Sequence, residues 1–250
     1  MARARPLRPL GTTFLRTDSV ELGVRSRSVW RGLQLGAWPF VGGLHMGLWQ
    51  IDGINDKHAI IGRAVAVIPM FDRERINRED LTELYAGYRY RIDTEQGEAN
   101  LGYVDRRFAF SPAATHRRSI EGAVQHRIDA PLTEIRPILG LAAARETGDA
   151  PTTWVEGKFV FEAGLPPRNN NEASYGGRVE LRGAVSNFPV AEESQRTMRF
   201  HDAVFALWLS ADRSSTVVGP LMIEFGGELW WTRVPPNTAY GVAALRLVVR

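Results

Sequence analysis

Cysteine is absent from the 250-residue sequence, and lysine is nearly so. Without cysteine the chain can form no disulfide bond, no thiolate nucleophile and no cysteine-ligated metal site. Lys57 and Lys158 are the two lysines, which leaves 31 − 2 = 29 arginines among the basic residues. No uninterrupted apolar run reaches the roughly eighteen residues that a membrane-spanning helix requires. These absences exclude thiol chemistry and insertion into a membrane as a helix.

The charges are nearly balanced and well mixed. The chain has 31 basic and 28 acidic residues, with a net charge of +3, and no basic block occurs beyond the first ten residues. A nucleic-acid-binding chain concentrates its basic residues in a patch, so we expect no nucleic-acid partner. Residues 1–18 are basic and contain proline, and we expect a tail there, followed by one domain over residues 19–250. The tail starts like a signal peptide but has no apolar stretch of about seven residues.

The clearest structural pattern lies between Leu81 and Phe108. In its first half apolar side chains alternate with charged or polar ones, for example Leu84 and Tyr88 against Glu83 and Arg89. Side chains in a β-strand point alternately to two faces, so this segment has one apolar and one charged face. A turn and a second alternating run follow, which together predict a β-hairpin.

The same alternation recurs along the chain, and the connecting segments are rich in glycine, proline, asparagine and aspartate. It is found at 19–31, 44–49, 119–129, 133–145, 153–163, 173–186, 199–210, 217–231 and 238–250, and less regularly at 59–68. Residues 36–39, which contain glycine and proline, predict a turn between the first two strands. No helical segments are expected between these strands, so we predict an all-β fold. Consecutive hairpins predict a single antiparallel up-and-down barrel of about twelve strands, an even number that places both termini on one side.

Two features favour a transmembrane barrel. The polar face pairs arginine with glutamate in strand after strand, and the planar, bidentate pairs that arginine forms suit a crowded polar interior. Aromatic residues also fall near strand ends, as in the aromatic belts of membrane barrels. These residues are Trp30, Trp38, Phe40, Tyr103, Trp154, Trp230, Trp231 and Tyr240. A soluble ligand-binding β-barrel is the alternative, because its strands alternate in the same way with the apolar face turned inward.

In addition to this pattern, several segments are similar to those of a known protein family. They are SVELGVRSRSVWRGLQL, GGLHMGLWQID, LTELYAGYRYRID, GEANLGYVDRRF and YGVAALRLVVR. They are similar to a family of porin-like bacterial outer-membrane β-barrels of uncharacterised function. The family's motifs correspond to Trp30-Arg31-Gly32, Gly47-Leu48-Trp49 and Glu83-Leu84-Tyr85-Ala86-Gly87-Tyr88. The resemblance implies the bacterial outer membrane as the location and membrane lipids as partners. It implies no catalytic residues, because its motifs are structural.

The membrane-barrel hypothesis makes specific predictions about side-chain direction. We expect these residues to face outward: Leu84, Tyr88, Leu139, Phe159, Leu181, Phe205, Leu221 and Leu245. We expect these to face inward and line the lumen: Arg25, Arg27, Arg31, Glu83, Arg89, Arg91, Glu121, Arg127, Glu134, Arg136, Glu156, Lys158, Arg178, Glu180, Arg182, Glu224 and Arg246. The acidic residues Glu21, Asp93, Glu98, Glu162 and Glu228 are expected on the same inward face. The predicted function is a narrow pore of low selectivity for small polar or anionic solutes, or a structural barrel whose lumen is closed by charge pairs.

The sequence offers little for catalysis. Its five histidines show no metal-binding spacing, and no phosphate-binding glycine motif is present. We therefore expect no metal, no cofactor and no enzymatic activity. His201 and Asp202, with Ser186 or Ser210, supply the residue types of a Ser-His-acid set. An outer-membrane lipid hydrolase is kept as a second alternative for that reason.

Overall fold

The computed structural model describes residues 15–30, 33–37, 39–48, 58–69, 81–93, 97–108, 116–128, 135–147, 151–165, 174–187, 198–215, 219–233 and 239–249. Its strands are β1 (Leu15–Arg25), β2 (Arg27–Trp30), β3 (Leu33–Ala37), β4 (Pro39–Leu48), β5 (His58–Pro69), β6 (Leu81–Asp93), β7 (Gly97–Phe108), β8 (His116–Arg127), β9 (Ile135–Glu146), β10 (Thr153–Leu165), β11 (Ser174–Ser186), β12 (Arg199–Ser215), β13 (Gly219–Thr232) and β14 (Ala239–Val249). Within the ranges described, no helix is long and apolar enough to cross a membrane.

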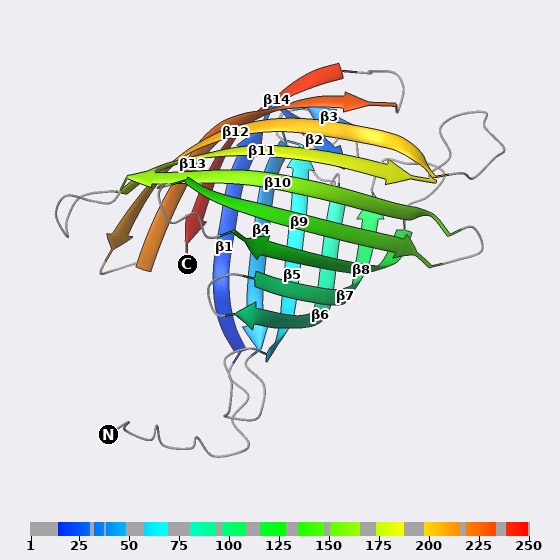
Figure 1. Cartoon of the computed structure of the whole chain (residues 1–250), viewed down its shortest axis with the longest axis horizontal. Helices are drawn as coiled ribbons and strands as arrows, with labels where there is room; N and C mark the ends of the chain where they lie inside the picture. The colour runs from blue at the N-terminus through cyan, green and yellow to red at the C-terminus, as the bar shows by residue number, and fades with distance from the viewer. Residues whose placement is uncertain are drawn as a thin grey trace, which may run out of the picture.

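Twelve of the strands form one closed barrel. Their order around it is β1-β14-β13-β12-β11-β10-β9-β8-β7-β6-β5-β4, and every neighbouring pair is antiparallel. From β4 to β14 each strand pairs with the next one in the chain, and β14 pairs with β1 to close the ring (Figure 1). The predicted twelve-stranded up-and-down barrel is therefore confirmed. The strands β2 and β3 form a separate two-stranded ladder.

The register defines the two ends of the barrel. Leu15 at the start of β1 pairs with Leu48 at the end of β4, and Val20 in the middle of β1 pairs with Val249 at the end of β14. Figure 1 shows the C-terminus beside β1. We call this end the terminal end and the opposite one the distal end. The segments joining strands at the terminal end are 49–57, 94–96, 128–134, 166–173 and 216–218. Those at the distal end are 26–38, 70–80, 109–115, 147–152, 187–198 and 233–238.

The apolar faces of the strands point out of the barrel. Leu84, Tyr88, Leu139, Leu181, Phe205 and Leu245 are all exposed, as predicted. Phe159 and Leu221 are less exposed but share this face, because they pair with outward residues on adjacent strands. The alternate positions are the buried ones; Glu83, for example, is only 8% exposed between its outward neighbours. Because alternate residues of a strand point to opposite sides, the buried and charged set faces the interior.

The first predicted strand differs from the observed one. The barrel strand β1 begins at Leu15, before the expected start at residue 19, and ends at Arg25, so Arg27 lies in β2. Ser26 ends the ladder: its backbone N donates to Ala243 O at 2.8 Å. In return, Ala243 N donates to the Ser26 side-chain Oγ, also at 2.8 Å. Because a side chain and not the Ser26 carbonyl accepts this bond, the chain leaves the sheet here and forms the β2–β3 hairpin.

Two further local predictions have different outcomes. The predicted turn at 36–39 is wrong in part, because β3 continues through Ala37 and β4 already begins at Pro39. The expected strand over 59–68 is confirmed as β5, which pairs with both β4 and β6.

Apolar side chains inside the barrel form small clusters near the distal end. One cluster consists of Val67, Leu81 and Phe108. Another consists of Val204, Trp230, Tyr240 and Val242. Val29 of β2 packs against this second cluster. The β2–β3 hairpin therefore contacts the interior wall at the distal end.

Candidate functional site: the charged interior of the barrel

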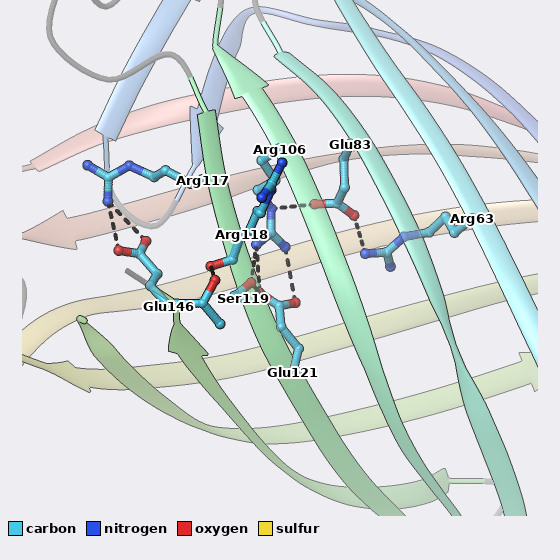
Figure 2. Close-up of polar contacts among 9 residues, drawn as sticks. Arg63, Glu83, Arg106, Arg117, Arg118, Ser119, Glu121 and Glu146 are labelled. Atoms are coloured by element: carbon cyan, nitrogen blue, oxygen red, sulfur yellow. Dashed lines mark hydrogen bonds and ion pairs between the residues drawn. The ribbon is translucent and has the colours of Figure 1, made fainter. Parts of the chain in front are cut away.

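Arg106 on β7 is at the centre of the first charged group. Its guanidinium donates from Nη1 and Nη2 to the two carboxylate oxygens of Glu121, at 2.6 and 3.0 Å. Its Nε donates to Glu83 at 2.6 Å, and Glu83 in turn accepts a hydrogen bond from Arg63. Figure 2 shows Arg106 between the two carboxylates, with Ser119 close by. At 6% exposure, Arg106 is a buried charge that needs these partners to offset its desolvation.

A separate pair lies next to this group. Arg117 on β8 is opposite Arg106 in the strand register. Its Nη1 donates to both carboxylate oxygens of Glu146 on β9, at 2.9 and 3.2 Å (Figure 2). The two neighbouring arginines therefore have their own carboxylates, which limits the repulsion between two like charges at adjacent positions.

The second charged group surrounds Glu228 on β13. Arg25 Nη2 donates to Glu228 at 2.7 Å, and Trp230 Nε1 donates to its other oxygen at 2.7 Å. Arg182 Nη2 lies 3.9 Å from Glu228, and Arg182 Nε lies 2.9 Å from Glu180. The Arg182 guanidinium also lies over the Trp230 ring, 5.2 Å from its centroid, a favourable cation–π geometry.

The third charged group surrounds Glu224, closer to the terminal end. Arg246 donates to Glu224 and also to Glu21, the latter at 3.3 Å. Arg178 Nη1 lies 3.8 Å from the other oxygen of Glu224. The guanidinium groups of Arg246 and Arg178 lie over the Trp208 ring at 4.9 and 5.7 Å. One buried indole therefore contacts both arginines of the group.

Each of these three groups contains two arginines and two glutamates. The sets are Arg63, Arg106, Glu83 and Glu121; Arg25, Arg182, Glu180 and Glu228; and Arg178, Arg246, Glu21 and Glu224. Arg178 Nε also lies 4.0 Å from Glu180 Oε2, so the second and third sets are in contact. Each set is electrically neutral in its ionised state. An unpaired charge in the low-dielectric interior of a narrow barrel is costly, so pairing within each set is the favourable arrangement. The interior presents polar and charged surface without a strong field of either sign.

The predicted lumen residues fall into several classes. Arg25, Glu83, Glu121, Arg178, Glu180, Arg182, Glu224 and Arg246 belong to the three groups. Arg89, Arg91, Glu156 and Lys158 occupy interior-facing positions by register. Arg127 Nη2 lies 3.8 Å from Glu162 Oε2, and both side chains are about one-third exposed. Arg27 lies in the β2–β3 hairpin, outside the barrel ladder. Arg31, Glu134 and the side chain of Arg136 lie outside the described residues.

Four interior residues were missed by the sequence prediction, namely Arg63, Arg106, Arg117 and Glu146. Extending the alternation of Leu101 and Tyr103 along β7 would have placed Arg106 opposite them. The signal was hidden because the next outward residues, Asp105 and Arg107, are themselves charged. The strand at 59–68 was predicted without an assignment of its two faces, so Arg63 received no role.

The residues of the suggested Ser-His-acid set do not all come together. Ser186, His201 and Asp202 are buried near the distal end of β11 and β12. His201 Nε2 lies 3.8 Å from Asp202 Oδ2, beyond hydrogen-bond distance. Ser210 is eight residues further along β12, about 26 Å away at the usual rise of a strand. Over the residues that the structure describes, no group of three or more His, Asp or Glu side chains could hold a metal ion.

The sequence matches no protein-family model and no curated protein. Its fold does match solved structures. An outer membrane channel from Pseudomonas putida has a TM-score of 0.52 at 9% identity, over 98% of this chain and 99% of that one. A bacterial polysaccharide outer membrane secretin has a TM-score of 0.51 at 10% identity, over 93% of this chain and 97% of that one. The chain has the fold of a bacterial outer-membrane β-barrel.

Proposed function

We propose that the protein resides in the bacterial outer membrane and forms a narrow, weakly selective passage for small polar solutes, anions included. The observation that carries this proposal is the set of three neutral arginine–glutamate groups inside a closed barrel whose outer face is apolar. Such an interior is polar enough to admit hydrated solutes and too balanced to attract ions of one sign strongly.

The outer face supports the membrane over the soluble alternative. Leu101 on β7 and Phe225 on the opposite wall, β13, are each 60% exposed, and Leu141 on β9 is 57% exposed, so the apolar surface extends around the barrel. A contiguous apolar surface of this kind is rare on soluble monomers and is the lipid-facing band of a membrane barrel. A soluble ligand-binding barrel would instead place these side chains inside. Solubility in detergent-free buffer would contradict the proposed location.

The connections between strands support an orientation. The terminal end carries the two shortest connections, 94–96 and 216–218, whereas the distal end carries long ones such as 187–198 and 26–38. Outer-membrane barrels have short periplasmic turns and longer extracellular loops. On this basis the terminal end faces the periplasm and the distal end faces the outside.

The proposed passage is narrowest where the charged groups are most buried. Interior charges on β8 and β10 toward the terminal end, such as Arg127 and Glu162, are partly exposed. Arg106 at the distal end and Glu228 on the opposite wall are almost completely buried. Glu224 is equally buried. We therefore place the constriction at the Arg106 group and at the groups around Glu228 and Glu224, and the wider part of the passage around Arg127 and Glu162.

A bilayer recording tests the proposal. The purified full chain is refolded in detergent, checked by heat-modifiable migration in a gel, and inserted into a planar lipid bilayer. We expect small, weakly selective conductance steps. The reversal potential in a salt gradient should lie near zero, because the three groups are neutral. The arginines of the first predicted strand add no anion preference, because Arg25 is paired with Glu228 and Arg27 lies in β2, outside the barrel ladder.

A correctly inserted barrel without any conductance would reject the passage. It would support the second candidate, a structural barrel whose lumen is closed by its charge pairs. The observation that favours this second candidate is the burial of Arg106 and Glu83 at the distal end. The hydrolase alternative has no comparable support in the geometry of His201 and Asp202.

A further inference from the structure

The outward arginines are distributed unevenly along the barrel. Three of them lie on adjacent strands at the distal end: Arg107 on β7, Arg118 on β8 and Arg145 on β9. The register brings them together, because Arg107 pairs with His116 and Arg118 pairs with Asp105, and Arg145 pairs with Ile120. We call Arg107, Arg118 and Arg145 the distal arginine cluster.

One carboxylate lies among these basic side chains. Asp105 Oδ2 is 2.7 Å from His116 Nε2 and 3.5 Å from Arg118 Nε. Asp105 Oδ1 is 3.8 Å from Arg107 Nε. The side chains of Arg107 and Arg118 nevertheless stay 73% and 55% exposed, and Arg145 is exposed as well. Three arginines against one aspartate leave an excess of two positive charges, with His116 counted as neutral.

Among the residues that the structure describes, those opposite the cluster on β6 and β10 are not acidic. Thr82 on β6 is opposite Arg107, and Thr153 on β10 is opposite Arg145. Thr147, next to the end of β9, bonds to the backbone oxygen of Arg118 through its own backbone N. The acids of the neighbouring strands, such as Glu83, face the interior. The positive charge of the cluster is therefore not balanced on the outer face by the described side chains of β6–β10.

The cluster borders directly on the apolar outer surface. Leu84 pairs with Asp105, and the next outward row contains Tyr103 and Ile120, all of them exposed apart from Asp105. Arginines at this boundary extend their charged ends to the level of the lipid headgroups while their stems stay against apolar surface. A guanidinium also matches a phosphate group geometrically and donates two parallel hydrogen bonds to it.

The outer face at the terminal end is different. His58 on β5 lies beside Tyr88 and Tyr90 on β6, with ring centroids 5.8 and 5.1 Å apart. On another part of the wall, Tyr175 at the terminal end of β11 is strongly exposed. Rings of this type form the uncharged aromatic belts of membrane interfaces. The two ends of the outer face therefore suit headgroups of different charge.

We propose that the distal arginine cluster binds the phosphate of an anionic lipid headgroup in the outer leaflet. This inference rests on the proposed insertion into the outer membrane. The occupant is a lipid, because the cluster lies on the outer wall beside the apolar band, where a bound phosphate carries its acyl chains along the exposed leucines and aromatic residues below.

The test compares two double variants with the same change in charge. R107A/R118A removes two members of the cluster. R199A/R233A is the matched control, because Arg199 and Arg233 are also exposed near the distal end but come from β12 and the end of β13. Each protein is purified in nonionic detergent and titrated with fluorescent phosphatidic acid, with fluorescent phosphatidylcholine as the zwitterionic comparison.

We expect wild type and R199A/R233A to bind phosphatidic acid with similar affinity. R107A/R118A should bind it at least about tenfold more weakly, since one charge-assisted hydrogen bond is worth about that factor. Equal weakening in both double variants would reject the cluster as the site. Equal affinity for the two lipids would reject recognition of the phosphate charge.

Two further measurements separate the remaining outcomes. If inorganic phosphate displaces the lipid at millimolar concentration, the site binds free phosphate and the lipid assignment is wrong. Heat-modifiable migration is recorded for every protein. A wild type that is soluble without detergent overturns the proposed location itself, whereas an inserted wild type without preference for phosphatidic acid overturns only this inference.

Discussion

Arg106 on β7 binds Glu121 on β8 through two parallel hydrogen bonds, at 2.6 and 3.0 Å. The same guanidinium reaches Glu83 on β6 through Nε, so one side chain links three adjacent strands. The neighbouring Arg107 points the other way and is largely exposed on the outer face. Two consecutive arginines therefore have opposite surroundings, which allows a direct comparison.

The substitution Arg106→Gln should destabilise the barrel strongly. Removing one partner of a buried ion pair leaves uncompensated charge, here on Glu83 and Glu121, at a cost of about 3–5 kcal/mol. The free energy of unfolding is measured by urea titration in lipid vesicles. The control Arg107→Gln removes an exposed side chain and should change it by less than about 0.5 kcal/mol. Equal effects of the two substitutions would show that Arg106 is not in a closed ionic network.

An arginine introduced on the apolar band should also destabilise the barrel. Leu141 lies near the middle of β9 and is 57% exposed. If this face contacts lipid, Leu141→Arg costs about 2–4 kcal/mol at the level of the bilayer midplane. Thr147→Arg, close to the distal end of the same strand, should cost about 1 kcal/mol or less. Unfolding in vesicles of fixed lipid composition measures both, and a Leu141→Arg protein as stable as wild type would contradict the lipid contact.

The Arg127–Glu162 pair allows the selectivity of the passage to be shifted in both directions. Both side chains are partly exposed and 3.8 Å apart, so either can be neutralised without leaving a buried charge. Arg127→Gln leaves an excess carboxylate and should move the reversal potential toward cation preference, and Glu162→Gln should move it toward anion preference. Arg107→Gln, on the outer face, should leave it unchanged. Shifts of the same sign for both interior variants would disprove the placement of this pair in the passage.

A glycine pair tests the close packing of Tyr85 inside the barrel. A Cβ added at Gly102 would lie 2.5 Å from Tyr85 Cζ and 2.6 Å from the Ala86 carbonyl oxygen, whereas one added at Gly157 would meet nothing within 4 Å. Gly102→Ala should therefore destabilise the barrel by about 1–3 kcal/mol through overpacking. Gly157→Ala should be neutral or stabilising by up to about 1 kcal/mol. The midpoints of thermal unfolding in detergent give the comparison, and tolerance of Gly102→Ala would mean that Tyr85 moves freely.

Strand pattern and fold class could be predicted from the sequence because side-chain alternation is a local property. Leu84, Tyr88 and Glu83 reveal both faces of β6 within a few residues, and the same reading holds for most strands up to β14. It failed where outward residues are themselves polar, as at Asp105 and Arg107 on β7. It also failed at Ser26, where a hydrogen bond with Ala243 from the other end of the chain ends β1.

The amino-acid sequence by itself determined that the chain forms half-apolar strands and that arginine and glutamate share the opposite face. Only the tertiary structure decided which arginine meets which glutamate. Arg25 and Glu228 are 203 residues apart and meet because the barrel closes between β1 and β14. Their pairing depends on the strand register and on ring closure. A one-residue slip of a strand would turn every charged side chain to the outer face, so the neutrality of the three groups is a property of the closed barrel.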